Sequence, residues 1–138
     1  MRPRICSTHG ATIVAKNDAL AAAAARTALN RAQMDGLLTG NTAYIDLPPG
    51  GPGGPHGGVA FAYYGSNGHA SFRLPTGTIL TGTWSLRDDH YCADWENGPK
   101  NSCTRIVRMP GSVLVIDHAT GQTRGMIASI VPGNAENL

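Results

Sequence analysis

The sequence predicts a mainly β fold, a small antiparallel meander of about eight short strands closed as a calycin-like up-and-down barrel, with a helix in front. Eighteen glycines and nine prolines, about a fifth of the 138 residues, supply turns between short segments. Apolar and polar residues alternate repeatedly, most clearly from Leu80 to Arg87. Closing such a meander removes its exposed edges. An open, strongly bent sheet wrapped over the helix is the alternative.

The helix is expected to begin after Asn30. Asn30 can cap its N-terminus, and Gln33, at the third helical position, can complete a capping box. Leu29 and Met34 have the spacing of a hydrophobic staple. Gly40 suits the C-terminal stop. The pattern therefore predicts a short helix that leads directly into the β-domain.

The strand segments are joined by residues typical of tight turns. The sequence Gly65-Ser66-Asn67-Gly68 contains the Asn-Gly pair of a hairpin turn. The insert 48–58 holds four prolines and six glycines and cannot form a sheet interior. We expect a surface loop there, with a lid over a pocket or a contact surface for a partner protein as alternatives. The predicted strands are 43–47, 59–64, 69–74, 78–87, 90–95, 103–108, 112–117 and 123–131.

The chain divides into an N-terminal arm, 1–28, and a single β-domain, 29–138. The arm carries an alanine-rich stretch that favours helix. It begins with Met1-Arg2-Pro3-Arg4, which resembles the charged start of an export signal, but Lys16, Asn17 and Asp18 interrupt the apolar region. The arm could therefore be the remnant of a signal.

The composition argues against two classes of partner. No stretch reaches the ~20 apolar residues of a membrane span. The net charge is only +2 and the arginines are scattered, so we do not expect the chain to bind nucleic acid. The oligomeric state is left open.

Two of the three cysteines are expected to pair. Cys92 and Cys103 lie on strands that a hairpin makes neighbours, while Cys6 stands in the polar arm. A disulfide implies an oxidising compartment, so we predict a periplasmic or secreted protein. Two buried free thiols in a cytosolic protein are the alternative.

Several short motifs occur in an order that resembles one family. The motifs are LTGNT (38–42), YYGSNG (63–68), GTW (82–84), YCADW (91–95), SCTRIVR (102–108) and VPGN (131–134). Together they resemble a family of small exported bacterial proteins of unknown function. Members of that family carry a signal peptide, a short helix ending in L-[ST]-G-N-T, and a β-domain with a C-x-x-W … C unit. The resemblance implies a periplasmic or secreted β-fold and supplies no catalytic residues.

The histidines do not have the spacing of a metal site. None of the five histidines forms a pair at i,i+2 or i,i+4, and the cysteines lack C-x-x-C spacing. His90 and Cys92 share a strand face, but Cys92 is better explained by the disulfide. We therefore expect no metal and no other cofactor.

Whether the protein is an enzyme stays open at this point. Asp-His pairs occur at 89–90 and 117–118, but adjacent strand residues point to opposite faces, so neither pair is expected to form a dyad. In a cofactor-free lyase, isomerase or hydrolase, the acid–base groups would be His90 with Asp94 across the sheet, or His69 with Tyr64. An arginine would hold an anionic substrate.

Binding of a small molecule is the favoured function. An exported module that binds an apolar or anionic ligand, or that serves the cell envelope, would use aromatic side chains with an arginine at the pocket mouth. The candidates are Tyr64, Arg73, Trp84, Trp95 and Arg105. The alternative is that the two indoles pack on the disulfide in a core.

Overall fold

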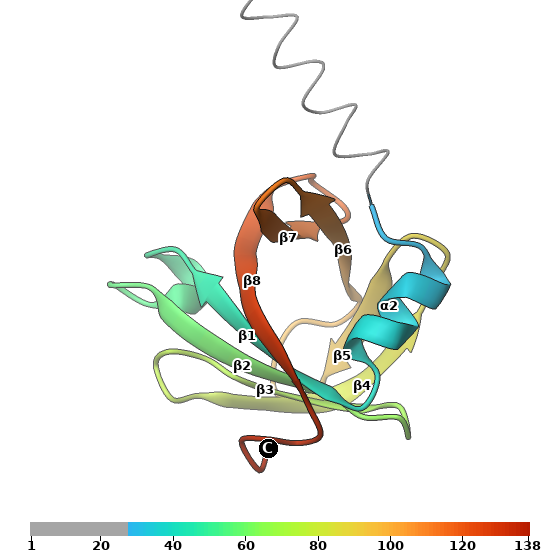
Figure 1. Ribbon diagram of the computed structural model, residues 1–138. Coiled ribbons are helices and arrows are strands. Elements are labelled where there is room, and N and C mark those ends of the chain that lie inside the picture. Colours follow the sequence, from blue (N-terminus) through green and yellow to red (C-terminus); the bar gives the residue numbers. More distant parts are fainter. Residues whose placement is uncertain (1–27) are drawn as a thin grey trace, which may run out of the picture.

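Residues 28–138 form a closed antiparallel barrel with one short α-helix beside it (Figure 1). The computed structural model describes residues 28–138. The predicted arm, with its alanine-rich stretch, its resemblance to an export signal and Cys6, therefore lies outside the described residues apart from Ala28. The elements are α2 (Arg31–Leu38), β1 (Asn41–Leu47), η1 (Gly51–Gly53), β2 (Gly58–Tyr64), β3 (His69–Arg73), β4 (Ile79–Leu86), β5 (Tyr91–Trp95), β6 (Ser102–Met109), β7 (Ser112–Asp117) and β8 (Thr123–Pro132).

The predicted up-and-down barrel is confirmed. Each strand pairs antiparallel with the next one along the chain, and β8 returns to pair with β1, so the order is that of a simple meander. The β1–β8 register runs from Asn41 opposite Pro132 to Asp46 opposite Met126, with an irregularity between Tyr44 and Ile45. This last pairing distinguishes the barrel from the open bent sheet that the sequence also allowed.

The predicted capping box begins helix α2. The side chain of Asn30 accepts a hydrogen bond from the Gln33 N–H at 2.9 Å, and the Asn30 N–H donates to Gln33 Oε1 at 2.9 Å. Gly40 follows the helix with φ +77°, a conformation that glycine adopts without strain. Met34 and Leu38 are the buried face of the helix. The helix therefore covers part of the barrel core with Met34 and Leu38, and the half-buried Leu37 packs against the same core.

The barrel core is formed by one face of each strand. Along β4 the half-buried Leu80 and Leu86 and the buried Trp84 belong to this core, while Thr81, Thr83 and Ser85 are exposed. The same alternation on β5 turns Tyr91, Ala93 and Trp95 inward, which leaves Cys92 and Asp94 on the outer face. This period-two pattern is the one that the sequence predicted.

The proline- and glycine-rich insert is a loop with local order. It contains the 3-10 turn η1, held by hydrogen bonds from Gly53 N–H to Gly50 O and from Gly54 N–H to Gly51 O. Gly53 is buried against Pro48. The prediction that this segment stays out of the sheet is confirmed, and the loop connects β1 to β2.

Candidate functional site

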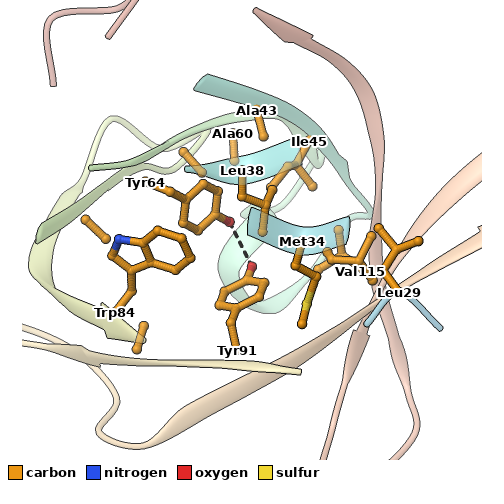
Figure 2. Close-up of a cluster of buried hydrophobic side chains, with 14 of the residues drawn as sticks. Leu29, Met34, Leu38, Ala43, Ile45, Ala60, Tyr64, Trp84, Tyr91 and Val115 are labelled. Atoms are coloured by element: carbon orange, nitrogen blue, oxygen red, sulfur yellow. Dashed lines mark hydrogen bonds between the residues drawn. The ribbon is translucent and has the colours of Figure 1, made fainter. Parts of the chain in front are cut away.

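The barrel interior is occupied by aromatic side chains (Figure 2). The hydroxyl oxygens of Tyr64 and Tyr91 share a buried hydrogen bond of 2.8 Å. Trp84 lies against both rings, with centroid distances of 5.2 Å to Tyr64 and 6.1 Å to Tyr91. Its Nε1–H donates to the Gly65 carbonyl at 2.8 Å, so the polar atom of the indole is satisfied within the protein.

The two phenols are held in their neutral form. Burial raises the pKa of Tyr64 well above its ordinary value, and the proximity and hydrogen bond of Tyr91 raise it further. Burial likewise raises the pKa of Tyr91, although hydrogen bonds with Tyr64 and Thr104 oppose the shift. These groups therefore act as packing and hydrogen-bonding residues at neutral pH.

The five residues predicted to bind a ligand do not converge. Tyr64, Trp84 and Trp95 belong to the buried core. Arg73 lies at the end of β3, and Arg105 lies on the outer face of β6, because the neighbouring Ile106 is part of the core. The indoles also do not pack on the disulfide as a core unit, since Cys92 lies on the face opposite to Trp95 on the same strand.

Arg73 is already engaged by protein groups. Its guanidinium donates to Glu136 Oε1 at 2.9 Å and stacks over the Phe61 ring at 4.6 Å from the centroid. The Tyr44 hydroxyl donates to the other oxygen of the same carboxylate at 2.8 Å. This network ties the C-terminal segment to β1, β2 and β3, so Arg73 has a structural role.

Chemically distinctive groups gather instead on the outer face of β5, β6 and β7. Cys92 and Cys103 are opposite each other in the β5–β6 register and form the predicted disulfide. The His118 N–H donates to the Cys103 carbonyl at 3.0 Å, which brings the end of β7 beside the disulfide. We call the set Asp89, His90 and His118 the outer-wall cluster.

The imidazoles of His90 and His118 are stacked. Their ring centroids are 3.8 Å apart and the planes are inclined by only 10°. His90 Nδ1 lies 2.7 Å from Asp89 Oδ1. The hydrogen bond with His90 is the largest influence that lowers the pKa of Asp89, so this carboxyl is ionised at neutral pH. A carboxylate in this position orients the imidazole and leaves Nε2 as the second nitrogen for chemistry.

Two buried side-chain atoms on this side of the barrel lack hydrogen-bond partners among the described residues, namely Arg105 Nε and His118 Nδ1. Buried polar atoms are nearly always hydrogen-bonded, because an unmade bond leaves their desolvation cost uncompensated. Both residues are only half-buried as a whole. A ligand, an ion or an ordered water can supply the partner that such an atom needs.

The sequence assigned His90 the wrong carboxylate partner. Asp94 Oδ1 accepts the Asn101 N–H at 2.6 Å, which fixes the β5–β6 connection, whereas His90 pairs with Asp89. The prediction that adjacent residues could not form a dyad fails because Asp89 precedes β5 and lies in a bend. The other suggested pair is not assembled either, since Tyr64 points into the core and His69 is exposed.

A shallow depression of about 90 Å³ adjoins the disulfide on the outer face of β4 and β5. Its wall includes Arg87, Cys92, Asp94 and Asn101. The proline- and glycine-rich loop does not contribute to it. The exterior of the barrel therefore offers both a small recess and, across the disulfide, the outer-wall cluster.

Sequence reasoning missed His118. The sequence places His118 beside an aspartate at a strand end, but its contact with His90 depends on the placement of β7 next to β6. Asp117 does not pair with His118, because it binds Arg124 at 2.9 Å and Thr120 Oγ1 at 3.0 Å.

Searches of protein-family models, curated proteins and solved structures give no match to this chain. No helix in the range 28–138 has the length and apolar character to cross a membrane.

Proposed function

We propose that this protein is an exported, disulfide-stabilised binding module that holds a small anionic ligand on its outer wall. The observation that carries the proposal is Arg105, whose buried Nε has no partner in the described part of the chain. A guanidinium with unused donors is suited to carboxylate, phosphate or sulfate. The ligand would lie across β6 beside His118, on the same face as the disulfide.

The contrast between the arginines supports this choice. Arg73 and Arg124 are paired with Glu136 and Asp117, respectively, at 2.9 Å. Arg108 is exposed on the same strand as Arg105. Of these four arginines, only Arg105 is half-buried with a buried N–H donor, Nε, that has no hydrogen-bond partner in residues 28–138. An anion bound there would be partly shielded from water, which strengthens a hydrogen bond between charged groups.

An apolar ligand inside the barrel is less well supported. Tyr64, Trp84 and Tyr91 contact one another in the interior, and Met34 and Leu38 from α2 are fully buried against the same core (Figure 2). A ligand of the usual size needs a cavity of about 300 Å³ or more. Accommodating one here would require these side chains to separate.

The disulfide supports location outside the cytosol. Cys92 and Cys103 are bonded, and disulfides persist in oxidising compartments such as the periplasm or the extracellular space. The resemblance to a family of small exported proteins leads to the same expectation. An envelope-associated role would fit this location as well.

The binding proposal is tested by calorimetric titration of the oxidised protein with phosphate, sulfate and citrate. At least one anion should bind, and Arg105→Gln should weaken it by about tenfold or more, the loss expected for one charged hydrogen-bonding group. Arg108→Gln is the matched control because it removes an exposed arginine from the same strand. Equal weakening in both variants, or no binding of any of the three anions, would contradict the proposal.

A second candidate is a cofactor-free enzyme that uses Asp89 and His90. The 2.7 Å contact between His90 Nδ1 and Asp89 Oδ1 is the arrangement that orients an imidazole as a general base. An esterase and lyase substrate screen would test it. Activity that survives His90→Ala unchanged would exclude this pair from the mechanism.

A further inference from the structure

We infer that Asp89, His90 and His118 form a binding site for a divalent transition-metal cation of the Zn²⁺ or Cu²⁺ class. One donor atom from each residue lies within 4.8 Å of the donor atoms of the other two. Two imidazoles and one carboxylate are the donor set that Zn²⁺ and Cu²⁺ prefer, whereas Ca²⁺ and Mg²⁺ select oxygen ligands.

The second observation is the state of the His118 side chain. Its Nδ1 is buried and makes no hydrogen bond within residues 28–138. A histidine nitrogen in this condition keeps a lone pair available when it is the unprotonated atom of the ring. A metal bound through this nitrogen would give it the partner that residues 28–138 do not supply.

The backbone around the three residues is fixed by several hydrogen bonds. The His118 N–H is bonded to the Cys103 carbonyl at 3.0 Å, and the Asp117 side chain accepts from the Ala119 N–H at 3.3 Å. On the other side, the Arg87 N–H donates to the His90 carbonyl at 2.8 Å across the β4–β5 turn. A fixed backbone leaves only side-chain rotations to be ordered when a metal binds, which reduces the entropy cost.

The stacked rings must rotate when the metal enters. The lone pair of an imidazole nitrogen lies in the ring plane, and the planes of His90 and His118 are inclined by only 10°. Parallel rings cannot aim both lone pairs at one point, so at least one ring has to turn about its Cβ–Cγ bond. The side chain of His90 is 21% exposed and has the freedom to do so.

The neighbouring sulfurs are not expected to contribute. Cys92 and Cys103 Sγ lie within 4.8 Å of a His90 nitrogen, but they are bonded to each other. Cysteine sulfur binds metals as a thiolate, and a disulfide offers no thiolate. In the oxidised protein the donors of the site are therefore nitrogen and oxygen.

The test is calorimetric titration of the full-length oxidised protein with Zn²⁺, with Mg²⁺ as the comparison ion. One Zn²⁺ should bind per chain, and His90→Ala and His118→Ala should each raise its Kd by at least about tenfold. His69→Ala is the matched control, because His69 is an exposed histidine at the start of β3. A Cys6→Ser/His9→Ala variant excludes capture of the metal by the N-terminal residues.

Ring spectroscopy gives a readout that a purely structural role would not change. In ¹⁵N spectra the ring nitrogens of His90 and His118 should shift together on addition of Zn²⁺, while those of His69 stay in place. A well-folded His118→Ala protein that binds Zn²⁺ as tightly as the wild type would overturn the inference. So would a wild-type protein that binds no Zn²⁺.

The metal proposal and the anion proposal can be disproved independently of each other. Arg105→Gln should lose anion binding and retain Zn²⁺ binding measured with the metal alone. His118→Ala should lose Zn²⁺ binding. Loss of Zn²⁺ binding in Arg105→Gln, with His118→Ala unaffected, would contradict the assignment of metal ligands.

Discussion

The hydroxyl groups of Tyr64 and Tyr91 meet at 2.8 Å in the middle of the barrel, joining strands β2 and β5, which do not pair with each other. Tyr91 also has a hydrogen bond with the Thr104 side chain. The two phenols are therefore unequal, because Tyr91 has a second partner, whereas within residues 28–138 the Tyr64 hydroxyl has a hydrogen bond with Tyr91 alone. This inequality leads to the first prediction.

Tyr91→Phe should destabilise the protein more than Tyr64→Phe does. Removing the Tyr91 hydroxyl leaves that of Tyr64 buried and unpaired, at a cost of about 2 kcal/mol, whereas the reverse change costs about 1 kcal/mol. Urea unfolding monitored by Trp fluorescence measures the loss of stability in each single variant. The double Phe variant should be less destabilised than the sum of the two, since it leaves neither hydroxyl unpaired. Equal costs would contradict the assigned hydrogen bonds.

Stability should fall in alkaline solution because of the same pair. Burial raises the pKa of both tyrosines in the folded state, so the unfolded chain loses these protons first. The stability that the neutral phenols contribute is complete below their ordinary pKa of 10.0 and is lost as pH rises through the raised folded-state values. Urea unfolding should be compared between about pH 9 and 11, roughly one unit on either side of the ordinary tyrosine pKa. Over this range the Tyr64→Phe/Tyr91→Phe variant should lose less stability than the wild type. A profile identical to that of the wild type would contradict the prediction.

Gly82 should not tolerate a side chain. A Cβ at this position would overlap the carbonyl of Asp94 on the paired strand, which is backbone and cannot move aside. We expect Gly82→Ala to cost more than about 3 kcal/mol in urea unfolding. Gly36→Ala is the control, because a Cβ there meets nothing within 4 Å and removes a glycine from helix α2. The control should stabilise the protein by about 0.5–1 kcal/mol.

The disulfide should contribute strongly to stability. It joins residues 11 apart in the sequence, and closing a loop of this length is worth about 3 kcal/mol in the chain-entropy account. Cys92→Ala/Cys103→Ala should therefore unfold at a clearly lower urea concentration. A thiol reductant should lower the urea concentration at which the wild type unfolds and should leave that of this variant unchanged. A wild type insensitive to reductant under partially unfolding conditions would contradict the prediction.

The fold was largely accessible from sequence because its evidence is local. The Asn30–Gln33 capping box, the Asn-Gly turn at 67–68 and the alternation along β4 each act over a few residues, and consecutive antiparallel strands need little further information. The disulfide followed from the same reasoning, since a hairpin brings its two strands together.

The candidate site was less accessible because its evidence is non-local. The stacking of His90 on His118 depends on how β6 places β7 relative to β5, and no short pattern records that relation. The alternation rule also failed at Asp89, because it applies within a strand and this residue lies before β5. Whether a barrel interior holds a cavity depends on the packing of side chains from every strand.

The most direct test of the account is a ¹H–¹⁵N spectrum of the oxidised protein titrated in turn with phosphate, sulfate and citrate. The Arg105 Nε–H reports on the outer wall and the Trp84 Nε1–H, bonded to Gly65 O, reports on the interior. We predict that the Arg105 resonance shifts with a bound anion while the Trp84 indole resonance stays unchanged. A shift of the Trp84 resonance with an unmoved Arg105 resonance would contradict binding on the outer wall.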